Sequence, residues 1–309
     1  MQNDVRSRGR ARPRTRRRGQ YLRFATPYLL LTPAMVLLVV LMVVPIVMVL
    51  VYSVIERAVV NPDYTFIGLE SYTKVLSDDI FWDSIVHTAL FSLFSVIAHF
   101  ALGLFFAIVL NSEHLNRRLR TALRSVFLLP WLFTMAVVAV LWRMILNPSG
   151  VLNWLLEVVG VTDGTTEWLA SSTWALPVLI CVNIWAGYPL YMISLLAGLQ
   201  SVPKDLQEAS LVDRAGAFTR FRYVTLPHLW PIMISLGLLD FIWTSQQFPL
   251  VWLLTGGGPI HATEVAPTYI YKLAFSQYQF GQASAAAVVL LGLTLILGLF
   301  YLRHQRANG

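Results

Sequence analysis

The sequence is poor in cysteine and in charge. Its 309 residues include one cysteine, Cys181, which excludes a disulfide framework and a cysteine metal site. Only 13% of the residues are charged, whereas 57% are hydrophobic and the mean hydropathy is +0.64. A water-soluble domain cannot usually bury that much apolar surface, so the composition favours an integral membrane protein.

Two signatures of catalysis are also missing. The only lysines are Lys74, Lys204 and Lys272, and none follows a glycine-rich loop, so the sequence has no Walker A nucleotide site. No two of the six histidines lie three or four residues apart, which excludes the HExxH type of metal site. We therefore expect a chain that is not an enzyme, with no catalytic residue, metal or cofactor of its own. His87 and His99 are expected to be packing or interfacial residues.

Long apolar runs are abundant instead. Six are long enough to cross about 30 Å of hydrocarbon, which takes roughly 20 helical residues. They cover residues 24–55, 84–112, 125–142, 168–203, 232–254 and 273–302. The fold class expected is an all-α integral membrane protein with six transmembrane helices, and an even number of spans places both termini on one side.

The positive charge is unevenly distributed. The net charge is +7, and 19 of the 23 Lys and Arg fall in residues 1–23, 117–124, 204–222 and the C-terminus. Because cytoplasmic loops are rich in Lys and Arg, both termini are predicted to be cytoplasmic. Residues 1–23 are expected to form a disordered basic tail before a membrane domain over 24–309. The tail could bind nucleic acid, but we favour a role near lipid headgroups.

A charged, amphipathic island separates the fourth and fifth runs at residues 204–231. Asp205 is expected to cap a helix that carries Glu208 in its first turn and ends near Gly216. A second amphipathic piece would begin at Phe218, interrupted by the two prolines of the island before the next span. The island therefore predicts two short helices at the membrane surface.

This island resembles the EAA loop of the integral membrane subunits of bacterial ABC importers. The matching positions are Glu208, Ala209, Val224, Leu226 and Pro227, while Ser210 stands for the second alanine and Arg214 for the motif glycine, with Gly216 two places later. In that family the loop docks on a cytoplasmic ATPase. The resemblance implies ATPase coupling by Glu208, Ala209, Ser210, Asp213, Arg214 and Gly216.

Other segments resemble the permeases of carbohydrate-uptake ABC importers, of the maltose, glycerol-phosphate and oligosaccharide type. These segments are FIGLESY at 66–72, TGGGP at 255–259, PTYIYKLAF at 267–275 and FGQASAAAV at 280–288. The resemblance implies a type I ABC importer permease fold in the bacterial inner membrane. It also implies a second homologous permease, an ATPase subunit dimer that binds ATP and Mg²⁺, and an extracytoplasmic solute-binding protein as partners.

The fifth apolar run contains one acidic residue, Asp240, nine residues beyond Pro231. Nine helical residues cover about 14 Å, which places Asp240 near the middle of the hydrocarbon layer, where an ionisable group suggests function. Trp243, Thr244 and Gln247 share its helical face, and such side chains can bind sugar hydroxyls and rings. The resemblance adds Ala186, Gly187 and Leu190 to a substrate path. Alternatively, Asp240 bonds to a neighbouring helix while Trp243 and Gln247 face the sister permease.

The function predicted is therefore that of a permease subunit of an ABC importer for an oligosaccharide, a monosaccharide or a polyol. A second hypothesis is a stand-alone secondary transporter in which Asp240 relays a proton. A third, a membrane-embedded enzyme, is disfavoured because no paired His and carboxylate cluster is present.

Overall fold

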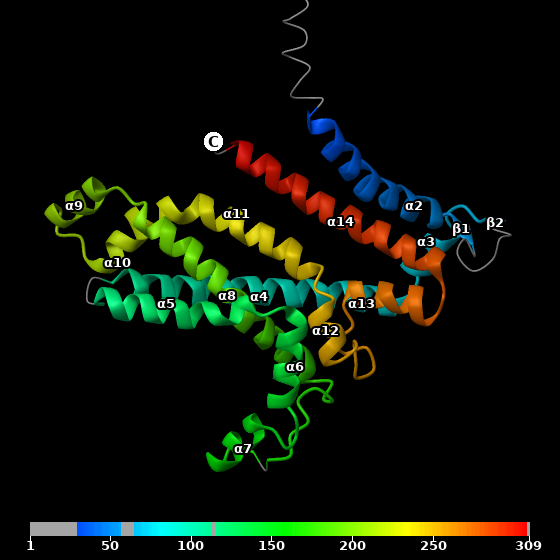
Figure 1. Ribbon diagram of the computed structural model, residues 1–309, viewed down its shortest axis with the longest axis horizontal. Helices are drawn as coiled ribbons and strands as arrows, with labels where there is room; N and C mark the ends of the chain where they lie inside the picture. The colour runs from blue at the N-terminus through cyan, green and yellow to red at the C-terminus, as the bar shows by residue number, and fades with distance from the viewer. Residues whose placement is uncertain (1–29, 57–64, 113–114, 163, 308–309) are drawn as a thin grey trace, which may run out of the picture.

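Long helices that run side by side form the body of the molecule (Figure 1). The computed structural model describes residues 30–56, 65–112, 115–162 and 164–307. Over these residues, five helices are long and apolar enough to cross a membrane: Leu30–Tyr52, Asp79–Asn111, Ala175–Gln200, Ala217–Ser245 and Phe280–Leu299. A sixth span is a bent pair, so the prediction of six spans is confirmed when the pair counts as one. The basic tail lies outside the described residues.

The elements follow one another in a simple order along the chain. They are η1 (Val39–Val43), α2 (Val44–Tyr52), β1 (Ile55–Glu56), β2 (Thr65–Phe66), α3 (Glu70–Leu76), α4 (Asp79–Asn111), α5 (Arg117–Leu132), α6 (Met135–Ile145), α7 (Val151–Val158), α8 (Ala175–Gln200), α9 (Lys204–Val212), α10 (Ala217–Arg220), η2 (Phe221–Thr225), α11 (Leu226–Ser245), α12 (Pro249–Leu254), α13 (Ala266–Tyr271), η3 (Lys272–Ser276) and α14 (Phe280–Ala307). Helices α9 and α10 lie at one end of the bundle, and α3, β1 and β2 lie at the other (Figure 1).

The third span, expected at residues 125–142, is broken into two helices. Helices α5 and α6 meet at 97°. Phe133 and Thr134 between them have extended backbone, and the Thr134 hydroxyl accepts a 3.5 Å hydrogen bond from the Val137 N–H as the cap of α6. Pro130, one turn earlier in α5, lacks a backbone donor and weakens the helix there.

The fifth span also departs from expectation, because Pro227 and Pro231 do not interrupt it. Helical structure continues from Ala217 to Ser245. The π turn η2 accommodates Pro227: the Leu226 N–H bonds back to the Phe221 carbonyl, and Pro227 follows in the first turn of α11. The helix instead ends at Ser245, nine residues before the predicted end at 254, and α12 follows a short break.

The most extensive helix pairing in the bundle joins α4 to α8. At its centre Gly103 contacts Tyr191, and a Cβ added to Gly103 would lie 2.3 Å from the Tyr191 Cβ. Ala107, one turn further along α4, is fully buried. The small residues at these two positions, four apart on one face of α4, permit this close contact.

The outer surface of the bundle is apolar. None of the residues of α2 is buried. Apart from Tyr52, they are all aliphatic residues, methionine or proline. Such a helix is stable in lipid, where exposed apolar side chains carry no hydration penalty.

Gly103→Ala is expected to separate α4 from α8, because the backbone of Met192 lies 3.0 Å from the added methyl group and cannot give way cheaply. We expect the free energy of unfolding to fall by about 1–3 kcal/mol, measured by denaturant titration in detergent. Gly292→Ala in α14 is the matched control, since nothing lies within 4 Å of its added Cβ. Equal stability of the two variants would contradict the packing described.

Candidate functional site

Helix α9 and the turn that follows form the first candidate site, at one end of the bundle (Figure 1). The predicted capping by Asp205 was wrong. Pro203 occupies the N-cap without a side-chain bond, Asp205 lies in the first turn, and Glu208 follows one turn later. The helix ends at Val212, earlier than the predicted end near Gly216.

Arg214 terminates α9 in a conformation that glycine usually adopts. Its φ is +53°, in the left-handed region. The Arg214 N–H bonds to the Leu211 carbonyl and the Ala215 N–H to the Ser210 carbonyl, both at 3.0 Å, which is the Schellman arrangement. Gly216 instead has φ −63° and caps α10. At the position of the motif glycine, Arg214 therefore adopts the left-handed conformation that glycine would adopt there.

The face that α9 presents to its surroundings is mixed apolar and acidic. Glu208, Leu211 and Val212 are exposed, and because Leu211 and Val212 lie three and four residues after Glu208, both flank it on one side of the helix. Val212 is 83% exposed, although it lies beyond the ends of the spans. Ser210 points inward, and its hydroxyl bonds to the Gln207 carbonyl at 2.6 Å. An exposed apolar face at this end fits contact with another protein.

The second candidate site surrounds Asp240 at the junction of α4, α8 and α11. The Asp240 Oδ2 contacts His99 Nδ1 at 2.7 Å and accepts the Tyr191 hydroxyl at 2.8 Å. Its Oδ1 accepts the Thr244 hydroxyl at 3.0 Å. A hydrogen bond to a neighbouring helix, the alternative to a path-lining role, is thus present.

The two ring nitrogens of His99 determine the charge of this cluster. His99 Nε2 lies 3.1 Å from the Asn183 carbonyl oxygen, which can only accept, so this nitrogen carries hydrogen. His99 Nδ1 and the Asp240 carboxyl then share one proton. Whichever atom holds it, the pair has no net charge, which lowers the cost of its burial.

Gly187 makes room for this histidine. A Cβ added to Gly187 would lie 2.3 Å from His99 Nε2. Any larger residue would therefore push His99 away from Asn183 and Asp240. The resemblance placed Gly187 on the substrate path, and the structure gives it this packing role.

The remaining residues of the predicted substrate path do not share one environment. Trp243 is 59% exposed, whereas Thr244 is buried against Asp240. Gln247 lies beyond the end of α11, and Leu190 is half-buried on α8. The path-lining role of these four residues, and of Asp240 and Gly187, stays a prediction.

Sequence reasoning missed a polar stripe along α4. Its members are Ser84, Thr88, Ser92, Ser95 and His99, all buried. Their spacing of four, four, three and four residues places them on one helical face within an otherwise apolar run. That spacing was the available signal, because polar residues in a span face the protein interior and pair with one another.

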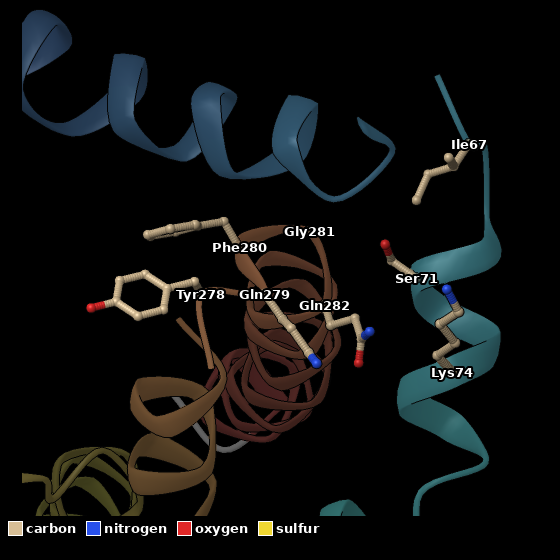
Figure 2. A pocket seen from close by; sticks show the side chains of 8 residues that line it. All are labelled: Ile67, Ser71, Lys74, Tyr278, Gln279, Phe280, Gly281 and Gln282. Atoms are coloured by element: carbon tan, nitrogen blue, oxygen red, sulfur yellow. The ribbon is translucent and has the colours of Figure 1, made fainter. Parts of the chain in front are cut away.

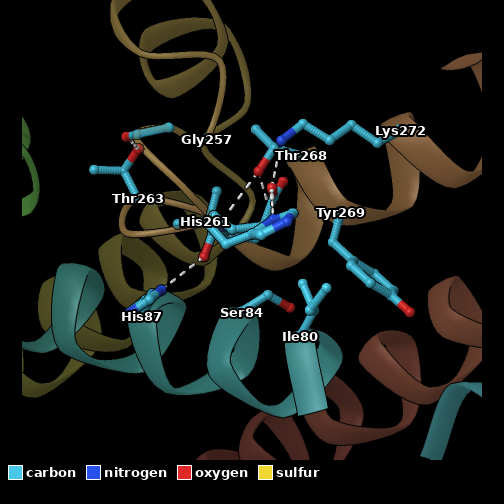
Figure 3. A network of polar contacts seen from close by, with 12 residues as sticks. Ile80, Ser84, His87, Gly257, His261, Thr263, Thr268, Tyr269 and Lys272 are labelled. Atoms are coloured by element: carbon cyan, nitrogen blue, oxygen red, sulfur yellow. Dashed lines mark hydrogen bonds and ion pairs between the residues drawn. The ribbon is translucent and has the colours of Figure 1, made fainter. Parts of the chain in front are cut away.

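The loop after α12, with the sequence TGGGP, covers a buried ion pair (Figure 3). Glu264 is fully buried, and its Oε2 contacts Lys272 Nζ and, at 3.0 Å, His261 Nδ1. Gly257 has φ +85°, and an added Cβ would lie 2.8 Å from the same oxygen. Glycine is therefore required at 257 for both conformation and space.

The same loop is attached to α4 by its backbone. His87 Nδ1 contacts the Glu264 carbonyl at 3.1 Å, and the Ala266 N–H donates to the Thr88 hydroxyl at 2.9 Å. Helix α13 is held nearby by the Tyr269 hydroxyl, which donates to Asp78 at 2.7 Å. Burial, reinforced by Asp78, raises the pKa of Tyr269 above its ordinary value, so the hydroxyl stays protonated to higher pH than a free tyrosine. Within the described residues, no cluster of His, Cys, Asp and Glu is arranged to hold a metal ion.

A helical bundle of six apolar spans, with a buried polar centre and a short exposed helix at one end, is the architecture of a polytopic membrane protein, and ionisable groups inside such spans mark a functional site. The chain belongs to the family of binding-protein-dependent transport system inner membrane components, which matches residues 100–308. It is therefore a multi-pass inner-membrane protein, and its fold is that of the type I ABC importer permeases.

Individual relatives agree with this assignment. The trehalose/maltose transport system permease protein MalF of Thermococcus litoralis is 38% identical over 249 residues, 79% of this chain and 81% of the relative. The sulfoquinovosyl glycerol transport system permease protein SmoG of Agrobacterium fabrum is 32% identical over 244 residues, which cover 79% of this chain and 78% of the relative. A bacterial ABC transporter involved in import of the acidic polysaccharide alginate has a similar fold, with TM-score 0.82 and 24% identity over 94% of this chain and 99% of that one.

Arg214→Val is expected to destabilise the end of α9, because a β-branched side chain is strongly disfavoured at positive φ. A cost of about 1–2 kcal/mol corresponds to a rise of roughly tenfold in amide hydrogen exchange over Lys204–Val212. Arg214→Gly is the matched control and should leave exchange equal or slower. Equal exchange in the two variants would contradict the role of the left-handed turn.

His99→Gln and Asp240→Asn test the pairing of α4 with α11. Each single substitution should lower the free energy of unfolding by about 1–3 kcal/mol, since each leaves a buried polar partner unpaired. The double variant should lose less than the sum, with a coupling of about 1 kcal/mol, measured by denaturant titration. Additive effects would show that the two side chains do not interact.

Proposed function

We propose that this chain is a permease subunit of an ATP-driven importer for a sugar, either an oligosaccharide, a monosaccharide or a polyol. Membership of the binding-protein-dependent family supports the importer role. The names of the relatives, which include trehalose/maltose and sulfoquinovosyl glycerol, support a carbohydrate. An alginate importer with a similar fold is known in complex with a periplasmic protein that holds an alginate pentasaccharide.

The observation that carries the coupling role is the exposed face of α9. Apolar Leu211 and Val212 lie beside Glu208 at the end of the bundle, where the arginine distribution predicts cytoplasm. A soluble protein that docks there would bury this face. We assign the docked partner as a separate ATPase, because the sequence contains no Walker A site and import against a gradient needs an energy source.

The assembly proposed contains this chain, a second homologous permease, an ATPase dimer and an external solute-binding protein. ATP and Mg²⁺ are bound by the ATPase subunits. Closure of the ATPase dimer on ATP would move α9, together with α8 and α11 to which it is joined. Trp243 and Gln247 are the residues we propose to meet the sugar, since an exposed indole can pack on a pyranose ring and an amide can bind its hydroxyls.

A secondary transporter is the second candidate, and the His99–Asp240 pair favours it because such pairs can relay protons. The two candidates differ in energy source. Uptake by vesicles that contain the assembly and ATP, but no ion gradient, would support the importer; uptake that needs a gradient and no ATPase would support the carrier.

Glu208→Lys should abolish sugar uptake, because it reverses the charge on the proposed docking face. We expect uptake by reconstituted vesicles to fall at least about tenfold, with a matching loss of ATPase co-purification. Glu167→Lys, an exposed residue in the segment between α7 and α8, is the matched control and should leave both unchanged. Normal uptake and normal ATPase association by the Glu208 variant would contradict the coupling role.

A further inference from the structure

A small pocket lies between α3 and the first turn of α14, at the end of the bundle opposite α9 (Figures 1 and 2). Its volume is about 200 Å³. The polar side chains that line it are Ser71, Lys74, Gln279 and Gln282. Figure 2 shows the two glutamine amides extending toward Ser71 and Lys74, while the rings of Tyr278 and Phe280 point to the other side.

The start of α14 contributes backbone donors to this pocket. The Ala283 N–H bonds to the Gln279 carbonyl, so the helical hydrogen bonds begin at residue 283. The N–H groups of Phe280, Gly281 and Gln282, all lining residues, thus have no partner within the helix. The N-terminus of a helix of 28 residues also carries a partial positive charge.

Ser71 is an independent sign of a ligand. The residue is 2% exposed, and its hydroxyl makes no hydrogen bond to any part of the chain that the structure describes. The hydroxyl faces the α14 terminus, since a Cβ added to Gly281 would lie 3.2 Å from Ser71 Oγ. The hydroxyl lines the pocket, so a ligand there can accept its hydrogen bond.

Most of the polar groups around the pocket can donate, whereas the Ile55 carbonyl oxygen, 2.9 Å from a Cβ added to Gly281, is an acceptor. Three backbone N–H groups, the Ser71 hydroxyl and the Lys74 ammonium group can donate, and the two glutamines add amide donors. Lys74 also pairs with Glu70 at 2.9 Å, but Glu70 does not line the pocket. A ligand with several acceptor oxygens and negative charge, such as a phosphate group, matches this set.

The position of the pocket indicates the source of the phosphate. The span Leu30–Tyr52 ends here and the span Phe280–Leu299 begins here, so the pocket lies at the boundary of the hydrocarbon layer. The Tyr52 carbonyl lies 3.6 Å from a Cβ added to Gly281, which brings the two span ends together. Phe66 and Tyr278 nearby are both largely exposed, as expected for aromatic residues at the level of lipid headgroups.

We propose that this pocket binds the phosphate group of a phospholipid, in the leaflet at the α3 end. By the predicted orientation this is the outer leaflet. The site would hold α3 against the ends of both spans, because Ser71 and Lys74 belong to α3 and the other donors to the first turn of α14 and to Gln279 just before it. The proposal does not depend on the solute or on the ATPase partner.

The test is native mass spectrometry of the full-length chain purified in detergent and titrated with phosphatidylglycerol. Ser71→Ala and Lys74→Gln should each weaken retention of one lipid molecule by about fivefold, the effect of one lost hydrogen bond of about 1 kcal/mol. Glu70→Gln should strengthen it, because it removes a competing carboxylate from Lys74. Ser77→Ala and Thr73→Ala, exposed on the same helix, are the matched controls.

Inorganic phosphate is the second arm of the titration. Failure of millimolar phosphate to displace the lipid supports the lipid source, whereas binding of phosphate without retention of lipid would overturn it. Retention equal to wild type in both pocket variants would overturn the site itself. Circular dichroism of each variant shows that a loss of retention is not a loss of fold.

Discussion

The absence of water from the hydrocarbon layer is the constraint on which the structure depends. A polar group in a span must find its partner inside the protein, because an unsatisfied one costs several kcal/mol there. In the buried stripe of α4, Ser84 and Thr88 obey this constraint by bonding to carbonyls of their own helix. His99 obeys it by reaching both the Asn183 carbonyl on α8 and Asp240 on α11. Ser92 Oγ and Ser95 Oγ are exceptions, since they have no partner among the described residues. Glycine at 103 and 187 lets the helices approach closely enough for these bonds to form. Three helices thereby become one mechanical unit.

This unit connects the two ends of the bundle. Helix α9 follows α8 after three residues, and η2 leads from the other side of the same loop directly into α11. Because Tyr191 and Asp240 tie α8 to α11, the two helices resist separation at this point. Toward the other end of α4, His87 and Thr88 hold the glycine loop and the start of α13. Helix α4 therefore contacts both the helices that would receive force and the loop that covers the Glu264 ion pair.

Sequence reasoning was reliable where the lipid decides the outcome and failed where local hydrogen bonds decide it. Uncharged runs of span length predict membrane helices because lipid excludes unpaired charge, and the six runs were found. The break at Thr134 depends on a helix cap, and the continuity of the helix across Pro227 depends on a π turn. Apolar composition predicts neither of them. The partner of Asp240 lies 141 residues away, so no local pattern could identify it. At Arg214 the motif was the better guide. Its position in the motif indicates a glycine-type turn, whereas an arginine by itself disfavours the left-handed conformation observed.

The pairing of Asp240 also bears on the kind of solute that could pass this point. Both carboxylate oxygens already accept hydrogen bonds, and the shared proton leaves the His99–Asp240 pair without net charge. A pair without net charge exerts little long-range attraction or repulsion on an ion. Recognition beside it would then fall to neutral groups, the exposed Trp243 indole and the amide of the half-buried Gln247. Neutral hydrogen-bonding groups and an aromatic face suit an uncharged polyhydroxy solute better than an ionic one, which accords with the proposed sugar substrate.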